Sequence, residues 1–79
     1  SHGALAVVTG AGSGIGAAFA TELGRRGSTV VCSDLDETAA RQTADAIRDR
    51  GAEALALRCD VSQVDDVHAL ADRAQEWFG

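Results

Sequence analysis

The fold is decided by Val7-Val8-Thr9-Gly10-Ala11-Gly12-Ser13-Gly14-Ile15-Gly16, where an apolar run stops at a cluster of glycines and a helical pattern begins. The run that leads into it, Leu5-Ala6-Val7-Val8, does not alternate with polar residues, so we expect a central strand covered on both faces. The glycines remove side chains where the backbone must turn sharply and where a ligand approaches the main chain. The first N–H groups of the helix that begins near Gly14 have no intrahelical partner, and a phosphate would satisfy them.

An acidic residue, Asp34, follows this turn at 20 residues after Gly14. Gly12-x-Gly14-x-x-Ala17 fits the G-x-G-x-x-G/A form of dinucleotide-binding turns, and Asp34 is the acid expected about 20 residues later. Because the carboxyl ends of neighbouring parallel strands lie together, the Asp34 carboxylate can accept hydrogen bonds from adenosine ribose hydroxyls. The alternatives are a glycine-rich turn that binds nothing and an Asp34 that only caps the next helix, although Asp36 is the better cap candidate. A P-loop is excluded because the chain has no Lys.

The same stretch carries a family resemblance. The run 9–16 is similar to the T-G-x-x-x-G-x-G turn of the short-chain dehydrogenase/reductase family, and Asp60-Val61 resembles the family's second cofactor motif. The resemblance covers nearly all 79 residues, which correspond to the first third of a typical family member. It places Asp60 and Val61 beside the adenine, whereas the residues alone also allow a loop acid next to a buried valine. The cofactor-binding residues that it implies are Gly10, Gly12, Ser13, Gly14, Ile15, Gly16, Asp34, Leu35, Asp60 and Val61.

The charge at Asp34 favours one nicotinamide cofactor over the other. At about 4 Å and an effective dielectric near 20, a carboxylate repels a phosphate charge by on the order of 4 kcal/mol. Ser13 and Leu35 stand at the two places where such family members often carry Arg or Lys, and both are uncharged. We therefore expect NAD to be preferred over NADP.

Three strand–helix repeats follow one another along the chain. They predict a βαβαβα unit of the α/β class, a partial Rossmann-like, doubly wound parallel sheet with right-handed crossovers and strand order 3-2-1. We expect residues 3–79 to form the N-terminal part of a dinucleotide-binding domain and Ser1-His2 to be a tag remnant. Strands are expected at 5–8, 28–33 and 54–59, and helices from near Gly14, over 37–50, and from a capping box of Ser62 and Asp65 to Phe78. The apolar stripes expected to face the sheet are Ile15, Phe19 and Leu23, with Ala18 between; Ala40, Ala44 and Ile47; and Val64, Val67, Leu70/Ala71, Ala74 and Phe78.

Composition excludes several classes of partner. A net charge of −5 with scattered Arg argues against nucleic-acid binding. The sequence contains no run of 18 apolar residues that would suggest a membrane span. Cys32 and Cys59 lack C-x-x-C or His spacing, so we expect buried, reduced thiols rather than a metal site, which fits a cytoplasmic protein. His68 is expected to face solvent. Trp77 and Phe78 should pack under the sheet edge or contact another chain.

The family's chemistry is not complete in this sequence. The resemblance implies hydride transfer between NAD(H) and an alcohol or carbonyl substrate, with catalytic Tyr, Lys, Ser and Asn, and a dimeric or tetrameric intact enzyme. The chain has no Tyr, Lys or Asn, so we assign no catalytic residue. We expect it to be the NAD-binding portion of an oxidoreductase, and we expect its substrate, a small alcohol or ketone, to bind a segment that is absent from this sequence. The alternatives are a stand-alone nucleotide-binding or interaction module, which would leave the first strand as an exposed edge, and a domain for another adenosine ligand such as S-adenosylmethionine or FAD.

Overall fold

Three parallel strands form one sheet in a computed structural model that describes residues 4–79. The strands are β1 (Leu5–Thr9), β2 (Thr29–Asp34) and β3 (Ala54–Arg58), and they lie in the order β1-β2-β3. Val7 pairs with Val31, and Val31 pairs with Leu55. The predicted strand order and α/β class are therefore confirmed. The expected tag remnant, Ser1-His2, and Gly3 lie outside the described residues.

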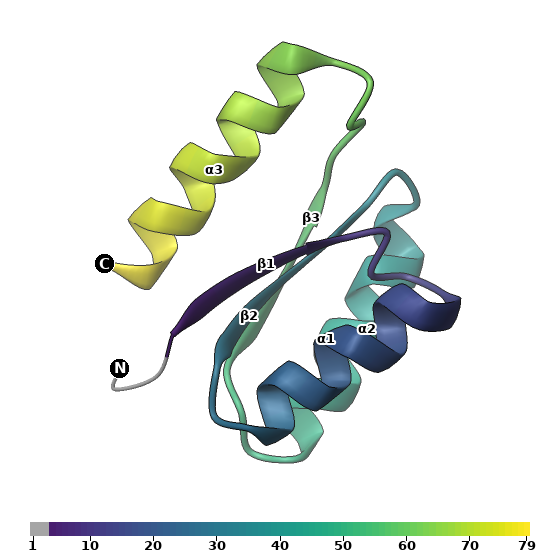
Figure 1. The fold of residues 1–79 in the computed structure, drawn as a ribbon, viewed down its shortest axis with the longest axis vertical. Helices are drawn as coiled ribbons and strands as arrows, with labels where there is room; N and C mark the ends of the chain where they lie inside the picture. The colour runs from purple at the N-terminus through teal and green to yellow at the C-terminus, as the bar shows by residue number, and fades with distance from the viewer. Residues whose placement is uncertain (1–3) are drawn as a thin grey trace.

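The helices cover the sheet unevenly. They are α1 (Gly14–Arg25), α2 (Glu37–Asp49) and α3 (Val64–Phe78), with α1 and α2 on one face and α3 on the other (Figure 1). Because side chains alternate along a strand, β2 sends Val30 and Cys32 into the core under α1 and α2 and Val31 into the core under α3. Within residues 4–79 the central strand is therefore β2.

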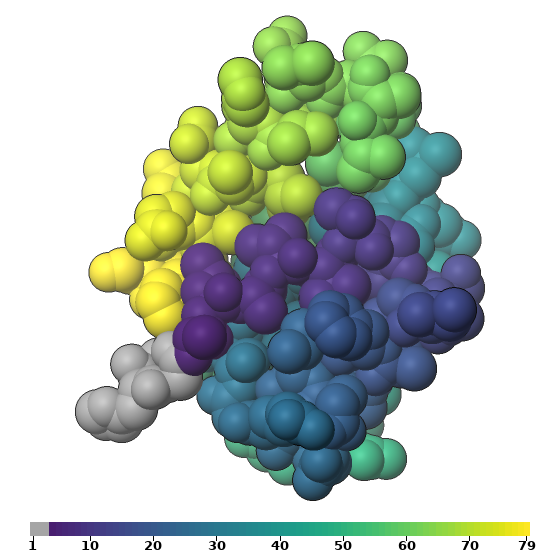
Figure 2. All heavy atoms as spheres, viewed as in Figure 1, coloured from purple at the N-terminus to yellow at the C-terminus, as the bar shows by residue number. Residues whose placement is uncertain are grey.

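The expectation that both faces of β1 are covered is wrong for the described chain. Val8 is buried under α1 and α2, but Val7 on the opposite face is 42% exposed. The reason is that α3 packs over β2 and β3, so the β1 edge stays on the surface, where Figure 2 shows it as a purple band.

The predicted buried stripe of α1 is also wrong in part. Ile15 and Phe19 are mostly exposed, and only Leu23 packs against the core. The helix instead buries its small residues, Ala20 and Gly24. A Cβ added to Gly24 would lie 2.8 Å from Cγ2 of Ile47 in α2, so the two helices approach too closely for larger side chains at this position.

The other two helices match their predictions to different degrees. In α2 the stripe of Ala40, Ala44 and Ile47 is buried as expected, and Asp36 caps the helix by accepting a 3.2 Å hydrogen bond from the Ala39 N–H. In α3 the buried residues are Leu70 and Ala74, whereas Val64, Val67 and Ala71 of the predicted stripe are exposed. Phe78 is half-buried and Trp77 is exposed.

The predicted capping box at the start of α3 is wrong. The N-cap is Gln63, and no side chain caps the helix. The hydroxyl of Ser62 donates instead to Oδ1 of Asp60, at 2.7 Å. The box fails because the helix begins at Val64, which places Ser62 one residue before the N-cap.

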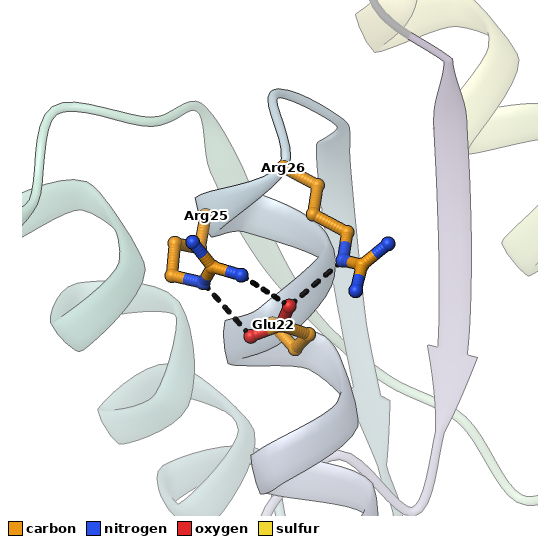
Figure 3. Close-up of polar contacts among 3 residues, drawn as sticks. All are labelled: Glu22, Arg25 and Arg26. Carbon is orange, nitrogen blue, oxygen red and sulfur yellow. Dashed lines mark hydrogen bonds and ion pairs between the residues drawn. The ribbon is translucent and has the colours of Figure 1, made fainter.

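The two cysteines are buried, whereas the arginines at the end of α1 are exposed. Cys32 and Cys59 are buried and carry free thiols, as predicted. Arg25 and Arg26, at the end of α1, are exposed and both pair with Glu22 (Figure 3). None of the helices in residues 4–79 has the length and apolar character needed to span a bilayer.

Candidate functional site

The carboxyl ends of the three strands bring the predicted site residues to one edge of the sheet. β1 ends at Thr9 and leads into the glycine-rich turn, β2 ends at Asp34, and β3 is followed by the loop that holds Asp60 and Val61. The three loops lie at the same end of the sheet, at the upper right of Figure 1. The fold therefore gathers segments that are separated by about 25 residues in the chain.

The shape of the turn requires glycine at two kinds of position. Gly10 has a φ of +66° and Gly14 a φ of +56°, which is the left-handed region that L side chains rarely adopt. Gly16 is required for a different reason, because a Cβ there would overlap the carbonyl oxygen of Gly10. The turn thus folds back on the first turn of α1, and the backbone of the two segments is in contact.

The start of α1 has no capping side chain. Ser13 is the N-cap residue with extended backbone, its side chain makes no capping hydrogen bond, and no acid lies in the first turn. The start of α2 differs, because Asp36 caps it and Glu37 adds a negative charge. Neither a capping side chain nor a first-turn acid therefore lies at the positive end of the α1 dipole, and Ser13, Gly14 and Ile15 around it are exposed.

Asp34 is tied to the turn through both carboxylate oxygens. Oδ2 accepts a 2.9 Å hydrogen bond from the Gly12 N–H, and Oδ1 accepts a 3.0 Å hydrogen bond from the Asp36 N–H. These backbone donors, that of Asp36 foremost, hold the pKa of Asp34 below its ordinary value. The result is an ionised, half-buried carboxylate held in one place beside the turn. The neighbouring Leu35 exposes its side chain.

The loop after β3 holds a second ordered carboxylate. Oδ1 of Asp60 accepts hydrogen bonds from the Ser62 hydroxyl, at 2.7 Å, and from the Ser62 N–H, at 3.0 Å. The hydroxyl foremost, with this N–H, lowers the pKa of Asp60. Val61 is 63% exposed, so the alternative of a buried valine beside a loop acid does not hold.

Sequence reasoning missed two residues that hold these loops. Thr43 in α2 donates a 2.7 Å hydrogen bond to the carbonyl of Ala11 in the turn, and Oδ2 of Asp66 in α3 accepts a 3.2 Å hydrogen bond from the Asp60 N–H. The available signal for Thr43 was a hydroxyl in the otherwise apolar stripe of α2. Asp66 gave no comparable signal, because acids are common in the first turn of a helix.

Other candidate chemistry lies away from this edge. His68 is exposed on α3, as predicted. In the part of the chain that the structure describes, no group of three or more His, Cys, Asp or Glu side chains could hold a metal ion. A cleft of about 510 Å³ lies at the opposite end of the sheet, where Gly24, Ile47 and Arg50 contribute to its wall.

These features define a Rossmann-like α/β domain with a glycine-rich turn between its first strand and helix. Residues 4–79 match the family model described as short chain dehydrogenase, and the chain belongs to that family. It is 53% identical over 75 residues to a cis-4-hydroxycyclohexanecarboxylate dehydrogenase from Sinomonas cyclohexanicum, covering 95% of this chain and 30% of that protein. It is 42% identical over 77 residues to a 7alpha-hydroxysteroid dehydrogenase from Escherichia coli, covering 98% of this chain and 30% of that protein.

The fold agrees with a solved structure from the same family. A short chain dehydrogenase/reductase from Burkholderia phymatum, crystallised in complex with NAD, superposes with a TM-score of 0.90 at 49% identity. The match covers 94% of this chain and 26% of that chain. The chain thus spans about 30% of the length of the curated relatives it matches.

Proposed function

We propose that this chain forms the part of an NAD-dependent short-chain oxidoreductase that binds the adenosine diphosphate moiety of NAD. The observation that carries the proposal is the hydrogen bond between Gly12 and Asp34, because it fixes a carboxylate beside an uncapped helix start. A pyrophosphate would satisfy the free N–H groups there, and a ribose would satisfy the free lone pairs of the carboxylate. The solved relative that holds NAD supports the same class of cofactor.

The space in front of the helix start is open to a ligand. No side chain projects from Gly14, and a Cβ placed there would meet nothing within 4 Å, so the space in front of the helix start is open. Gly10, Gly12 and Gly16 shape the turn, while Ser13 and Ile15 flank the open space. The backbone amides of this turn would hold the pyrophosphate.

Selectivity for NAD over NADP is assigned to Asp34. Its lowered pKa keeps the carboxylate ionised at neutral pH, where a 2′-phosphate would be repelled. The exposed side chain of Leu35 offers no positive charge to offset that repulsion. Asp60 and Val61 are proposed to contact the adenine, Asp60 as acceptor from the exocyclic amine and Val61 as an apolar surface.

The reaction is proposed at the level of the family. Oxidised NAD would accept a hydride from an alcohol carbon as the hydroxyl proton is released, and reduced NAD would return a hydride to a carbonyl carbon as its oxygen gains a proton. The role of this chain's residues is to hold and orient the adenosine end. The family's catalytic Tyr, Lys and Asn have no counterpart in these 79 residues. No residue of this chain is therefore assigned to the substrate, which stays a prediction: a small alcohol or ketone.

Calorimetric titration of the full-length protein with NAD and with NADP tests the proposal. We expect NAD to bind more tightly than NADP. Asp34→Ala should weaken the binding of NAD by roughly tenfold or more, because it removes hydrogen bonds to a charged acceptor. It should also reduce the ratio of the affinity for NAD to the affinity for NADP. Asp72→Ala, which removes an exposed charge midway along α3, should change neither affinity. An unchanged ratio in Asp34→Ala would refute the ribose assignment, and an absence of heat with both nucleotides would refute the proposed function.

A further inference from the structure

One peptide group in the glycine-rich turn is held from both sides. The carbonyl of Ala11 and the N–H of Gly12 belong to the same planar unit. The carbonyl accepts a 2.7 Å hydrogen bond from the Thr43 hydroxyl, and the N–H donates a 2.9 Å hydrogen bond to Oδ2 of Asp34. The donor of the first bond lies in α2, and the acceptor of the second ends β2. Two side chains from different elements therefore fix the orientation of this peptide plane.

The contact from α2 is buried at both ends. Ala11 is fully buried, and Thr43 is 8% exposed. The Thr43 hydroxyl also lies 3.4 Å from the carbonyl of Ala39, which is the usual acceptor for a threonine inside a helix. The shorter bond goes to the turn. Thr43 thus directs its hydroxyl to a segment 32 residues away in the chain, and its other helix neighbours in the stripe are apolar.

Loss of that hydroxyl would leave a buried carbonyl without its donor. An unsatisfied buried carbonyl is costly, and rotation of the peptide plane is the local way to relieve the cost. Rotation turns the N–H of Gly12 away from the carboxylate of Asp34. The two bonds are therefore coupled through a single rigid group, and the neighbouring amide of Ala11 is already fixed by its 2.9 Å hydrogen bond to the Ser33 carbonyl.

We propose that Thr43 is a positioning residue for the glycine-rich turn. Its hydroxyl holds the Ala11–Gly12 peptide in the orientation that points the Gly12 N–H at Asp34. Thr43 lies too deep to touch a nucleotide and acts through the turn and the carboxylate. The consequence for nucleotide affinity rests on the proposed function, whereas the consequence for the Gly12 amide does not.

The first test measures the turn without any nucleotide. Hydrogen exchange of the Gly12 amide is followed by NMR in the full-length protein and in three variants. Thr43→Val keeps the shape of the side chain but removes the hydroxyl, and we expect the Gly12 amide to exchange about tenfold faster relative to the Val31 amide of the central strand. Thr43→Ser keeps the hydroxyl and should restore slow exchange. Thr21→Val is the matched control, because it removes a threonine bond to the Ala17 carbonyl inside α1.

The outcomes of this test separate positioning from general packing. Selective acceleration at Gly12 in Thr43→Val, with rescue in Thr43→Ser and no change in Thr21→Val, supports the proposal. Equal acceleration at Gly12 and Val31 would mean that Thr43 only stabilises the fold, and this overturns the proposal. An unchanged Gly12 amide overturns it as well. Thr43→Ala provides the same comparison if the valine variant does not fold.

The second test adds NAD to the same proteins. Thr43→Val should bind NAD about three- to tenfold more weakly and discriminate less against NADP, while Thr43→Ser stays within about twofold of the wild type. A loss of stability alone would weaken the binding of NAD and NADP equally, so it would not reduce the discrimination between them. If the wild-type protein binds no NAD, the proposed function fails, and the exchange measurement still decides the role of Thr43. If exchange accelerates but affinity stays constant, the link from Thr43 to nucleotide binding is overturned.

Discussion

The backbone N–H of Gly12 donates a 2.9 Å hydrogen bond to Oδ2 of Asp34, which lies 22 residues further along the chain. A Cβ added to Gly12 would lie 2.8 Å from that same oxygen and 2.6 Å from the Cβ of Ala39. The turn, the end of β2 and the first turn of α2 therefore meet at a point where a methyl group does not fit. The characteristic spacing between glycine and acid corresponds here to a direct contact.

This contact predicts the effect of Gly12→Ala. The added methyl must displace Ala39 or the Asp34 carboxylate, and we expect a loss of about 1–3 kcal/mol in the free energy of unfolding, as for other overpacked sites. NAD affinity should fall in parallel, because the carboxylate moves. Chemical denaturation and calorimetric titration of the full-length protein measure the two effects.

A compensating variant tests the steric origin of that loss. Ala39→Gly alone should cost about 1 kcal/mol through lower helix propensity. In the double variant with Gly12→Ala, it removes the shortest of the three close contacts, so the combined loss should be smaller than the sum of the single losses. Strict additivity of the two losses would contradict the steric explanation.

The ionisation of Asp34 predicts a pH dependence of stability. Backbone hydrogen bonds lower its pKa in the folded protein from the ordinary value of 3.8. A lowered folded pKa contributes stability that is present above the ordinary value and is lost as the pH falls through the folded value. The difference in unfolding midpoint between the wild type and Asp34→Asn should therefore be largest near neutral pH and shrink below about pH 4.

The matched control for this experiment is Asp72→Asn, which removes one exposed charge on α3. It accounts for the general effect of net charge on acid unfolding. Thermal unfolding of the three proteins from about pH 7 to about pH 2 provides the comparison. A wild-type advantage over Asp34→Asn that persists unchanged at the acid end would show that ionisation of Asp34 does not stabilise the fold.

Burial predicts the reactivity of Cys32. Desolvation raises the pKa of this thiol to about 11, so the nucleophilic thiolate is scarce at neutral pH. We expect iodoacetamide to leave Cys32 unmodified in the native protein and to alkylate it readily in denaturant, with peptide mass mapping as the measurement. Rapid native alkylation of Cys32 would show that β2 opens to solvent or that the thiol is ionised.

Much of the fold could be predicted from the sequence because its signals are local. Each of these signals depends on a few neighbouring residues. The structure confirms a turn at the glycine cluster, strands at the three apolar runs and a helix cap at Asp36. Strand order followed from the three strand–helix repeats, which predicted a Rossmann-like unit. The meeting of the turn with Asp34 followed from the same prediction, because parallel strands place their carboxyl ends together.

The remaining features depend on contacts that no local pattern specifies. Periodicity identified Ile15 and Phe19 as one face of α1, but it does not say which surfaces are present to cover that face. The Ser62/Asp65 pattern predicted a helix start at Ser62, but α3 begins at Val64 with Gln63 as its N-cap. Thr43 looked like one polar residue in an apolar stripe, and its role emerged only when the fold placed Ala11 beside it.

Ser33 provides the last prediction, since its hydroxyl is fully buried and has no hydrogen-bond partner among the described residues. A buried hydroxyl without a partner destabilises the folded state by about 1–3 kcal/mol relative to an apolar group of similar size. Ser33→Ala should therefore raise the free energy of unfolding by about 1 kcal/mol, allowing for the small space left by the missing oxygen. Chemical denaturation of the full-length protein measures the change.

The comparison for Ser33→Ala is the same substitution at a serine that has a partner. The Ser62 hydroxyl donates to Asp60 at 2.7 Å, so Ser62→Ala should lower the free energy of unfolding by about 0.5–1.5 kcal/mol. The two substitutions remove identical atoms, but Ser33 is buried and has no acceptor, whereas Ser62 is exposed and has one. Opposite signs would confirm that the hydroxyl at the end of β2 is unsatisfied, whereas destabilisation by both would mean that Ser33 gains a partner in solution.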